Sequence, residues 1–199
     1  MALVYFLRVE WPLLAAGAKI IASTGFLATA ISVGALSHRF GQTIFAGLLL
    51  SLFGDLFLIG ISEQAFVLGL GFFLLAHIAY IVAFVTFGTD RKWAIAAAVP
   101  ITAITVIVAI WLTPSIPTDL LIPVRVYSIV IGLMVIAAFG ARGAGASSLV
   151  VAGALMFFVS DLSVAATRLV HVSFPTIIWG LPLYYAGQLC LAVSARKPA

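Results

Sequence analysis

Long apolar runs, separated by short polar or Pro- and Gly-rich connectors, are the feature that most limits how this chain can fold. Seven such runs can be marked, over residues 11–35, 42–60, 65–87, 93–112, 121–140, 146–169 and 174–194. An α-helix needs a run of about 20 residues to cross the hydrocarbon core of a bilayer, whereas barrel strands would give short segments of alternating polarity. The sequence therefore predicts an all-α polytopic transmembrane helix bundle with seven spans.

The composition supports this class. Of the 199 residues, 64% are hydrophobic and 8% are charged, which is too little polar surface to cover a soluble globule. We expect residues 1–199 to form a single transmembrane helical domain, with Met1–Glu10 too short to cross the bilayer and lying at its interface. Because the connectors are short, consecutive helices are expected to pack as neighbours, mostly antiparallel.

The positive net charge does not indicate a nucleic-acid partner. Ten Lys and Arg residues against six Asp and Glu give a net charge of +4, but the longest basic clusters are only Arg91-Lys92 and Arg196-Lys197. More basic residues fall in the first, third and fifth connectors and at the C-terminus than on the opposite side. The positive-inside rule therefore predicts a cytoplasmic C-terminus, in a multi-pass protein of the plasma (inner) membrane if the source is bacterial.

Two carboxylates interrupt the apolar runs. Asp55 ends the segment Ser51-Leu-Phe-Gly-Asp55, and Asp161 ends Leu155-Met-Phe-Phe-Val-Ser-Asp161. An ionisable residue inside a bilayer is costly, so by default it indicates a functional site. The predicted topology places both acids in the outer half of the membrane together with Lys19 and Arg125. The alternative is that the acids pair with these two cations only to hold helices together.

Helical spacing suggests which polar residues accompany the acids. Ser51 lies four residues before Asp55, and Arg168 lies seven beyond Asp161 on the same helical stripe. We expect one polar cavity, entered from the outer half of the bilayer, to hold the acids with the other candidates, which are Lys19, Ser51, His77, Tyr80, Arg125, Tyr127, Ser160, Tyr184, Tyr185 and Gln188.

Each of these candidates also has a structural interpretation. Lys19 could extend its amine to the membrane interface, and Arg125 and Arg168 could contact lipid headgroups near helix ends. His77 could be a hydrogen-bonded contact between helices, and the tyrosines could be packing aromatics.

Four motifs, in their order along the chain, resemble the signatures of the YhhN-like lysoplasmalogenase family. They are Ser51-Leu-Phe-Gly-Asp55, Gly69-Leu-Gly-Phe-Phe-Leu-Leu-Ala-His77-Ile-Ala-Tyr80, Gly153-Ala-Leu-Met-Phe-Phe-Val-Ser-Asp161 and Tyr184-Tyr-Ala-Gly-Gln188. Lys19 stands where that family has a Lys-Pro pair, although Ile20 replaces the proline here. The resemblance spans Lys19 to Ser194. It implies an eighth span, which would require residues 1–35 to fold as two short segments.

The resemblance implies a hydrolase that cleaves the vinyl ether bond of lysoplasmalogens to a fatty aldehyde and glycerophosphoethanolamine or glycerophosphocholine. Such a reaction needs one protonated acid and one carboxylate that stabilises a cation and orients water. Burial disfavours the charged form of a carboxyl group and a nearby cation favours it. We assign Asp161 as the general acid and Asp55 as the ionised partner near Lys19, and the reverse assignment stays open.

The remaining candidates have supporting roles in this scheme. Ser51, His77 and Ser160 would orient water or the acids, while Tyr184, Tyr185 and Gln188 would line the glycerol end of the substrate. Arg125 or Arg168 would hold the substrate phosphate, leaving the alkenyl chain between helices. The expected partners are therefore a lysophospholipid substrate, water and membrane lipids, with no cofactor and no metal.

Other classes fit the sequence less well. A proton-coupled transporter or channel could use the same acids, but the only internal echo, residues 51–58 against 157–164, is short and gives no inverted repeat. A zinc-dependent membrane hydrolase would need several histidines within the spans, and only His77 lies inside one. A retinal protein is disfavoured because the intramembrane lysine falls in the first span. A purely structural bundle would leave the acids without a reason.

Overall fold

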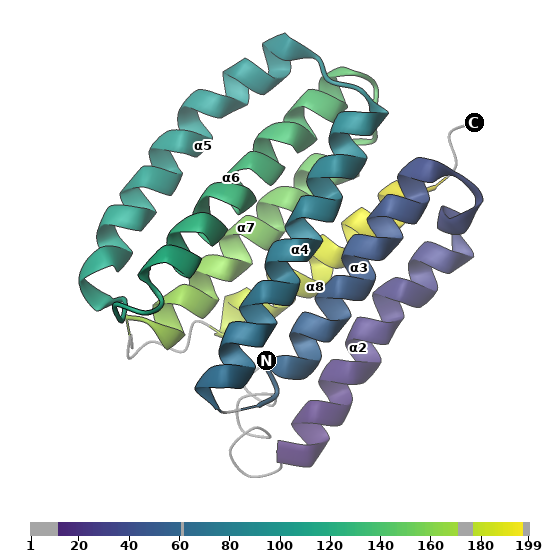
Figure 1. Cartoon of the computed structure of the whole chain (residues 1–199). Helices are drawn as coiled ribbons and strands as arrows, with labels where there is room; N and C mark the ends of the chain where they lie inside the picture. Colours follow the sequence, from purple (N-terminus) through teal and green to yellow (C-terminus); the bar gives the residue numbers. More distant parts are fainter. Residues whose placement is uncertain (1–11, 61, 171–176, 197–199) are drawn as a thin grey trace.

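The described residues of the computed structural model, which are 12–60, 62–170 and 177–196, form an elongated bundle of helices (Figure 1). Its α-helices are α2 (Pro12–Ser32), α3 (Arg39–Phe57), α4 (Glu63–Phe87), α5 (Arg91–Leu112), α6 (Leu121–Gly143), α7 (Ser148–Arg168) and α8 (Ile177–Ser194). Short 3-10 turns follow α2 at Ala35–Ser37 and α5 at Thr113–Ser115. The all-α prediction is confirmed, and each of the seven predicted runs overlaps one of these helices over most of its length.

Five of these helices, α3 to α7, are long and apolar enough to cross a membrane. In α2, a shorter apolar stretch covers Ala16–Ser32. Interpreted with the composition, this is a helical membrane bundle. The expectations for Met1–Glu10, and for an eighth span that would use residues before Pro12, fall outside the described residues.

Side-chain caps define where several helices begin. Ser62 accepts a hydrogen bond from the backbone N–H of Ala65 at the start of α4, and Asp90 accepts two from the first turn of α5. A cap of this kind satisfies backbone donors that have no partner within the helix. These caps fall in the connectors predicted from the sequence, so the polar connectors fix the ends of the spans.

Six helices pack in a ring, and α5 lies outside it. Going round the ring, each helix contacts the next in the order α2, α3, α4, α6, α7 and α8, and α8 closes the ring against α2. The helix α5 packs mainly on α6 (Figure 1). The expectation that consecutive helices are neighbours therefore fails at α4 and α5, because α6 occupies the place beside α4.

The tightest contact of the second half of the ring is between α7 and α8. A Cβ atom at Gly153 would lie 2.7 Å from Cγ of Leu191 and 2.8 Å from the carbonyl oxygen of Gly187. Only the absence of a side chain allows this approach, as is common where membrane helices pack closely. The contact packs the face of α7 that carries Gly153 against α8, whereas Asp161 on α7 accepts a hydrogen bond from Tyr127 on α6.

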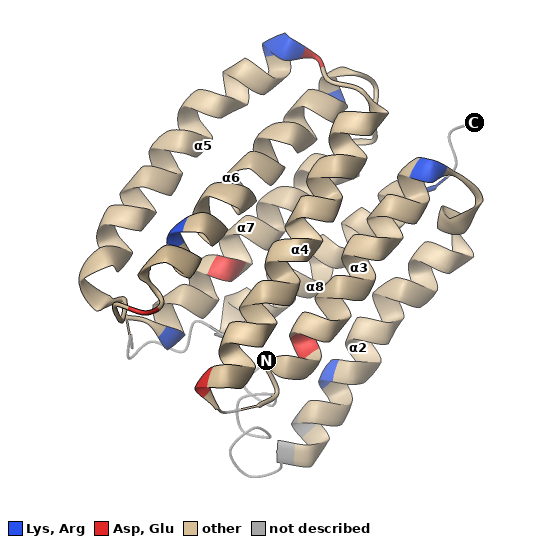
Figure 2. Ribbon diagram, viewed as in Figure 1, with Lys and Arg blue, Asp and Glu red and all other residues tan. Residues whose placement is uncertain are grey.

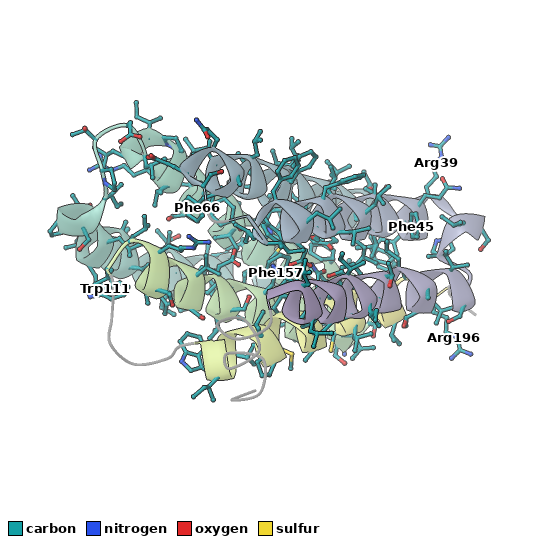
Figure 3. The ribbon with its side chains drawn as sticks, turned by 90° about the horizontal axis from the view of Figure 1, so that it is seen from below. Arg39, Phe45, Phe66, Trp111, Phe157 and Arg196 are labelled. Atoms are coloured by element: carbon teal, nitrogen blue, oxygen red, sulfur yellow. The ribbon has the colours of Figure 1, made fainter. Side chains whose placement is uncertain are left out.

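The two ends of the bundle differ in charge. Helices α3, α5 and α7 begin at one end, which we call the Arg39 end, and α4, α6 and α8 begin at the other, which we call the Glu63 end. Most of the charged residues lie near these ends, but acidic segments also occur within α3 and α7 (Figure 2). Figure 3 shows Arg39 and Arg196 together at one end and Phe157 near the middle of the bundle.

Candidate active site

Asp55 lies near the end of α3 and is held on both of its oxygens. Its Oδ1 lies 3.1 Å from Nζ of Lys19 on α2, which also donates to the Asp55 carbonyl at 3.3 Å. Its Oδ2 accepts hydrogen bonds of 2.6 Å from the hydroxyls of Ser23 on α2 and Tyr184 on α8. The residue is only 3% exposed. One cation and two hydroxyls, from two helices, thus compensate a buried carboxylate.

Asp161, in α7, has a sparser environment. Its Oδ2 accepts a 2.6 Å hydrogen bond from Tyr127 on α6 and lies 3.4 Å from Nε2 of His77 on α4. Among the described residues no group donates to its Oδ1, and its side chain is 18% exposed against 4% for Asp55. Asp161 therefore keeps one oxygen for a group that enters from outside the bundle.

His77 is linked to Asp161 mainly through Tyr127. Its Nε2 lies 2.9 Å from the hydroxyl of Tyr127, and its Nδ1 lies 3.3 Å from the sulfur of Met134. Because Tyr127 gives its hydroxyl proton to Asp161, Nε2 of the fully buried His77 can donate to the Tyr127 oxygen. The result is a buried relay of hydrogen bonds from α4 through α6 to α7.

A third polar group lies deeper in the bundle. Tyr80 donates a 2.9 Å hydrogen bond to Oε1 of Gln188, and its hydroxyl lies 3.5 Å from Oγ of Ser51. All three side chains are fully buried. The amide nitrogen of Gln188 has no hydrogen-bond partner among the described residues. This group links α3, α4 and α8 but contacts neither acid by a hydrogen bond.

Aromatic rings separate the three polar groups. The ring centroid of Phe157 lies 4.6 Å from that of His77, 5.3 Å from that of Tyr184 and 6.4 Å from that of Tyr80, in edge-on arrangements. Phe157 is thus the apolar hub of the site, and Figure 3 shows it near the centre of the bundle. By filling this position it fixes the rings that carry the hydroxyls of Tyr184 and Tyr80.

Both acids line one cavity of about 210 Å³. Its polar lining includes Lys19, Asp55, Tyr127, Ser160, Asp161 and Tyr184, together with Ser163 and Arg168 towards the end of α7. The rest of its wall is mostly aliphatic and aromatic, from α3 to α8. A single space therefore offers two carboxyl groups in unlike surroundings beside a large apolar surface.

The expectation of one cavity for all the candidates is only half fulfilled. Ser51, Tyr80 and Gln188 form the deeper group described above and do not line the cavity. His77 lies behind Tyr127, and Tyr185 points its hydroxyl to the Lys19 carbonyl at 3.4 Å and to Ser23 at 3.5 Å.

The two candidate arginines are placed differently. Arg125 is exposed and does not line the cavity, because its position on α6 turns it away from the acids. Arg168 does line the cavity, and its guanidinium carbon lies 5.5 Å from the ring centroid of Phe66 on α4. The sequence allowed either arginine to bind the substrate phosphate, and only Arg168 lines the cavity.

One site residue was missed from the sequence. Ser23 is fully buried and donates directly to Asp55. It lies four residues after Lys19, so both side chains leave the same face of α2. That spacing could have identified it. Within residues 12–60, 62–170 and 177–196, no group of three or more His, Cys, Asp or Glu side chains lies close enough to hold a metal ion.

One buried and one partly buried acid beside a largely apolar cavity, together with membrane-length helices, define an integral membrane protein with an intramembrane polar site. The YhhN family model matches residues 14–195, and the chain belongs to this family. The bovine (Bos taurus) protein Lysoplasmalogenase TMEM86A is 29% identical over 177 residues, which cover 82% of this chain and 70% of its relative. No solved structure matches the chain.

Proposed function

We propose that this protein is a membrane hydrolase that cleaves the vinyl ether bond of lysoplasmalogens to a fatty aldehyde and a glycerophospho-headgroup. The observation that carries the proposal is the single cavity lined by Asp55 and Asp161, with a compensated carboxylate on one side and a partly free one on the other. Membership of the YhhN family and the similarity to a protein named lysoplasmalogenase support it.

We assign Asp55 as the ionised partner. The ammonium of Lys19, 3.1 Å away, and the two hydroxyls that donate to Oδ2 all favour a negative charge at this position. A fixed carboxylate beside the cavity can stabilise a developing cation and orient the attacking water. Its role in the reaction is therefore electrostatic.

We assign Asp161 as the general acid. No Lys or Arg side chain is recorded within salt-bridge distance of it in the described part of the chain, and its Oδ1 is open to a reactant. With the proton on Oδ1, Oδ2 can still accept from Tyr127, so proton transfer leaves this hydrogen bond in place. Tyr127 and His77 act as positioning residues for the acid.

The reaction then needs only water. Asp161 gives its proton to the β-carbon of the vinyl ether, the double bond supplies the electron pair of the new C–H bond, and the ether oxygen shares its lone pair to form an oxocarbenium ion. Water adds to the cationic carbon and returns a proton to Asp161. In the resulting hemiacetal the bond to the glycerol oxygen breaks as the hemiacetal hydroxyl becomes the aldehyde carbonyl, and its proton passes to the glycerol oxygen, which leaves as a free hydroxyl group.

The charged end of the substrate belongs near Arg168. This residue lines the cavity at the Glu63 end and lies seven residues beyond Asp161, or about 10 Å along α7. Such a position suits a phosphate at the membrane surface whose vinyl ether reaches down to the acids. Arg125 is exposed and outside the cavity, so we assign it no contact with the substrate.

We further propose that the Arg39 end faces the cytoplasm and that the cavity therefore lies in the outer half of the bilayer. The support is the excess of Lys and Arg in the connectors of that end and at the C-terminus, on the opposite side from both acids. Labelling of single introduced cysteines in intact cells would test this. Access to residue 39 from outside would overturn it.

Aldehyde release is the direct test of the activity. Detergent-purified protein is mixed with lysoplasmenylethanolamine or with its saturated-ether analogue, and the aldehyde is measured. We expect aldehyde from the vinyl ether alone. No aldehyde from folded protein, with several headgroups and over a range of pH, would overturn the proposal, and proton flux in liposomes would then test the transporter alternative.

A further inference from the structure

The cavity has an apolar arm that the reaction itself does not use. Its wall includes Leu70 of α4, Thr105 and Val108 of α5 and Ile131 of α6, which line the same cavity as Asp161. We define these four as the arm residues. The chemistry described above involves Asp55, Asp161 and their polar partners, and none of the arm residues.

The arm exists because α4 and α5 are joined in sequence but barely touch. Among the described helices they are the only consecutive pair without a substantial contact, and both pack on α6. At the Arg39 end, the backbone N–H of Asp90 donates to the carbonyl of Gly140, which ties their connector to α6. The helix α6 thus forms the floor of a groove whose two walls are α4 and α5.

The groove is closed at the Glu63 end by a small hydrophobic cluster, separate from the main core. Its buried residues are Phe66, Leu112, Leu120, Val124 and Leu169. These side chains come from the ends of four helices and the connector before α6. A molecule in the arm is therefore covered on the side of the membrane surface.

The arm runs sideways into the bilayer. Thr105 lies seven residues before the end of α5, and Asp161 lies seven before the end of α7, at the same end of the bundle. Both positions are thus about 10 Å along the helix from the Glu63 end. Ile104 and Ile107, the neighbours of the arm on α5, are 44% and 66% exposed and meet the hydrocarbon of the membrane.

Thr105 packs closely on α6 beside the arm. A Cβ atom at Gly132 would lie 2.9 Å from its Oγ1, so only the absence of a side chain there allows this contact. The hydroxyl is buried and has no hydrogen-bond partner among the described residues. It is thus turned to α6, and the other arm residues are all aliphatic.

We propose that the arm binds the hydrocarbon tail of the substrate and is the route by which that tail enters from the bilayer. The proposal rests on the proposed function for the identity of the lipid. The occupant follows from the arm's aliphatic walls, from its continuity with Asp161 and from its depth in the membrane. The headgroup is assigned elsewhere, because Lys19 and Asp55 line the cavity at α2 and α3, and Arg168 lies over Phe66 at the Glu63 end.

Filling the arm should change the selectivity for tail length. The variant Val108→Trp places an indole in the arm, and Ile107→Trp adds the same group one residue away, on an exposed position. The substrates are lysoplasmenylethanolamines with short and long alkenyl tails. We expect Val108→Trp to lower the long-to-short ratio of kcat/KM by about tenfold or more, and Ile107→Trp to leave it unchanged. An unchanged ratio in folded Val108→Trp would overturn the proposal.

A second measurement separates this proposal from the first and does not require hydrolysis. A saturated single-chain phosphoethanolamine lipid with a diazirine at the end of its tail is photolysed with the protein in detergent. We expect labelled peptides from α5 in the wild type and in Ile107→Trp, and fewer in Val108→Trp. Labelling of α5 without aldehyde release would support tail binding in the arm and contradict the proposed reaction. Aldehyde release with labelling outside α5 would support the reaction and contradict tail binding in the arm.

Should Val108→Trp fail to fold, as judged by thermal unfolding, the smaller change Val108→Phe serves in both experiments. Thr105→Val also tests the arm, because it removes the unpaired hydroxyl and keeps the volume. It should not weaken labelling of α5. Loss of labelling in Thr105→Val, with the fold intact, would show that a polar contact and not an apolar one holds the lipid there, which contradicts the proposal.

Discussion

The two acids line one cavity, but their surroundings differ. Asp55 has a lysine and two hydroxyls on a side chain that is almost fully buried, and the groups that hold it come from α2 and α8. Asp161 has one tyrosine and one more distant histidine, and one of its oxygens is open. Asp55 is held in place and its charge is compensated by Lys19 and two hydroxyls. Asp161 is oriented by Tyr127, and one of its oxygens has no hydrogen-bond donor among the described residues.

In the proposed mechanism, this difference gives the two acids different roles in vinyl ether hydrolysis. A group that stabilises a cation should keep its charge and position throughout, and the partners of Asp55 favour both. A general acid must lose and regain a proton, and it can do so without repacking if its hydrogen bonds do not depend on its charge. The same substitution should therefore have a different effect at Asp55 and its partners than at Asp161 and its partners.

The largest effect on activity is expected at the acid. Asp161→Asn removes the transferable proton and should lower kcat by about 10²- to 10⁴-fold. The amide oxygen can still accept from Tyr127, so the thermal unfolding temperature should change little. Aldehyde release and unfolding are measured on the same purified sample. Full activity in Asp161→Asn would exclude it as the acid.

The same substitution at the other carboxylate should also destabilise the protein. Asp55→Asn leaves the Lys19 ammonium without its 3.1 Å partner in a largely buried place, at a cost of roughly 3–5 kcal/mol. The double variant Asp55→Asn with Lys19→Met should recover part of that loss, since no unpaired charge remains. Denaturant unfolding of the single and double variants measures the coupling. Additive losses would mean that the pair contributes nothing to stability.

The two tyrosines allow a matched comparison. Tyr127→Phe takes from Asp161 its one short hydrogen bond, so we expect kcat to fall about tenfold. Tyr184→Phe removes one of several hydrogen-bond partners of Asp55, so kcat should fall less than in Tyr127→Phe. The free energy of unfolding should fall by about 1 kcal/mol. Equal losses of kcat in the two variants would remove the contrast between the acids.

The smallest effect is expected at the headgroup end. Arg168→Gln should raise KM for the phospholipid severalfold and change kcat little, because the phosphate lies away from the bond that breaks. Arg125→Gln is the matched control, since Arg125 lies outside the cavity. Activity on an alkenylglycerol without phosphate should not respond to either change. A kcat defect in Arg168→Gln, or the same KM change in Arg125→Gln, would contradict this placement.

Much of the fold was predictable because the spans are limited by polar connectors. The approximate bounds of the helices follow from hydrophobicity and length, and the caps at Ser62 and Asp90 lie where the sequence breaks. Of the seven predicted spans, five correspond to described helices that are long and apolar enough to cross a membrane. The separation of α4 from α5 was not predictable. A short connector brings two helix ends together, but it does not say whether a third helix occupies the space between them.

The partners of the site residues were harder to predict than the residues themselves. The topology gave Lys19 and Asp55 a common depth, and they form an ion pair. Ser51 shares a face with Asp55 by spacing, yet its hydroxyl meets Tyr80. The lipid-facing and buried sides of these helices are similarly apolar, so periodicity does not give their rotation. For this reason the sequence could not separate Arg125 from Arg168.

The most direct test of the central claim, that Asp161 protonates the vinyl ether carbon, follows the proton itself. Wild type and Asp161→Asn are incubated with lysoplasmenylethanolamine in ²H₂O, and the aldehyde is trapped at once and analysed by mass spectrometry. The account predicts one deuterium at carbon 2 of the aldehyde from the wild type, and formation of that product slowed by about 10²-fold or more in the variant. Aldehyde without deuterium, or deuterated aldehyde from Asp161→Asn at the wild-type rate, would contradict it.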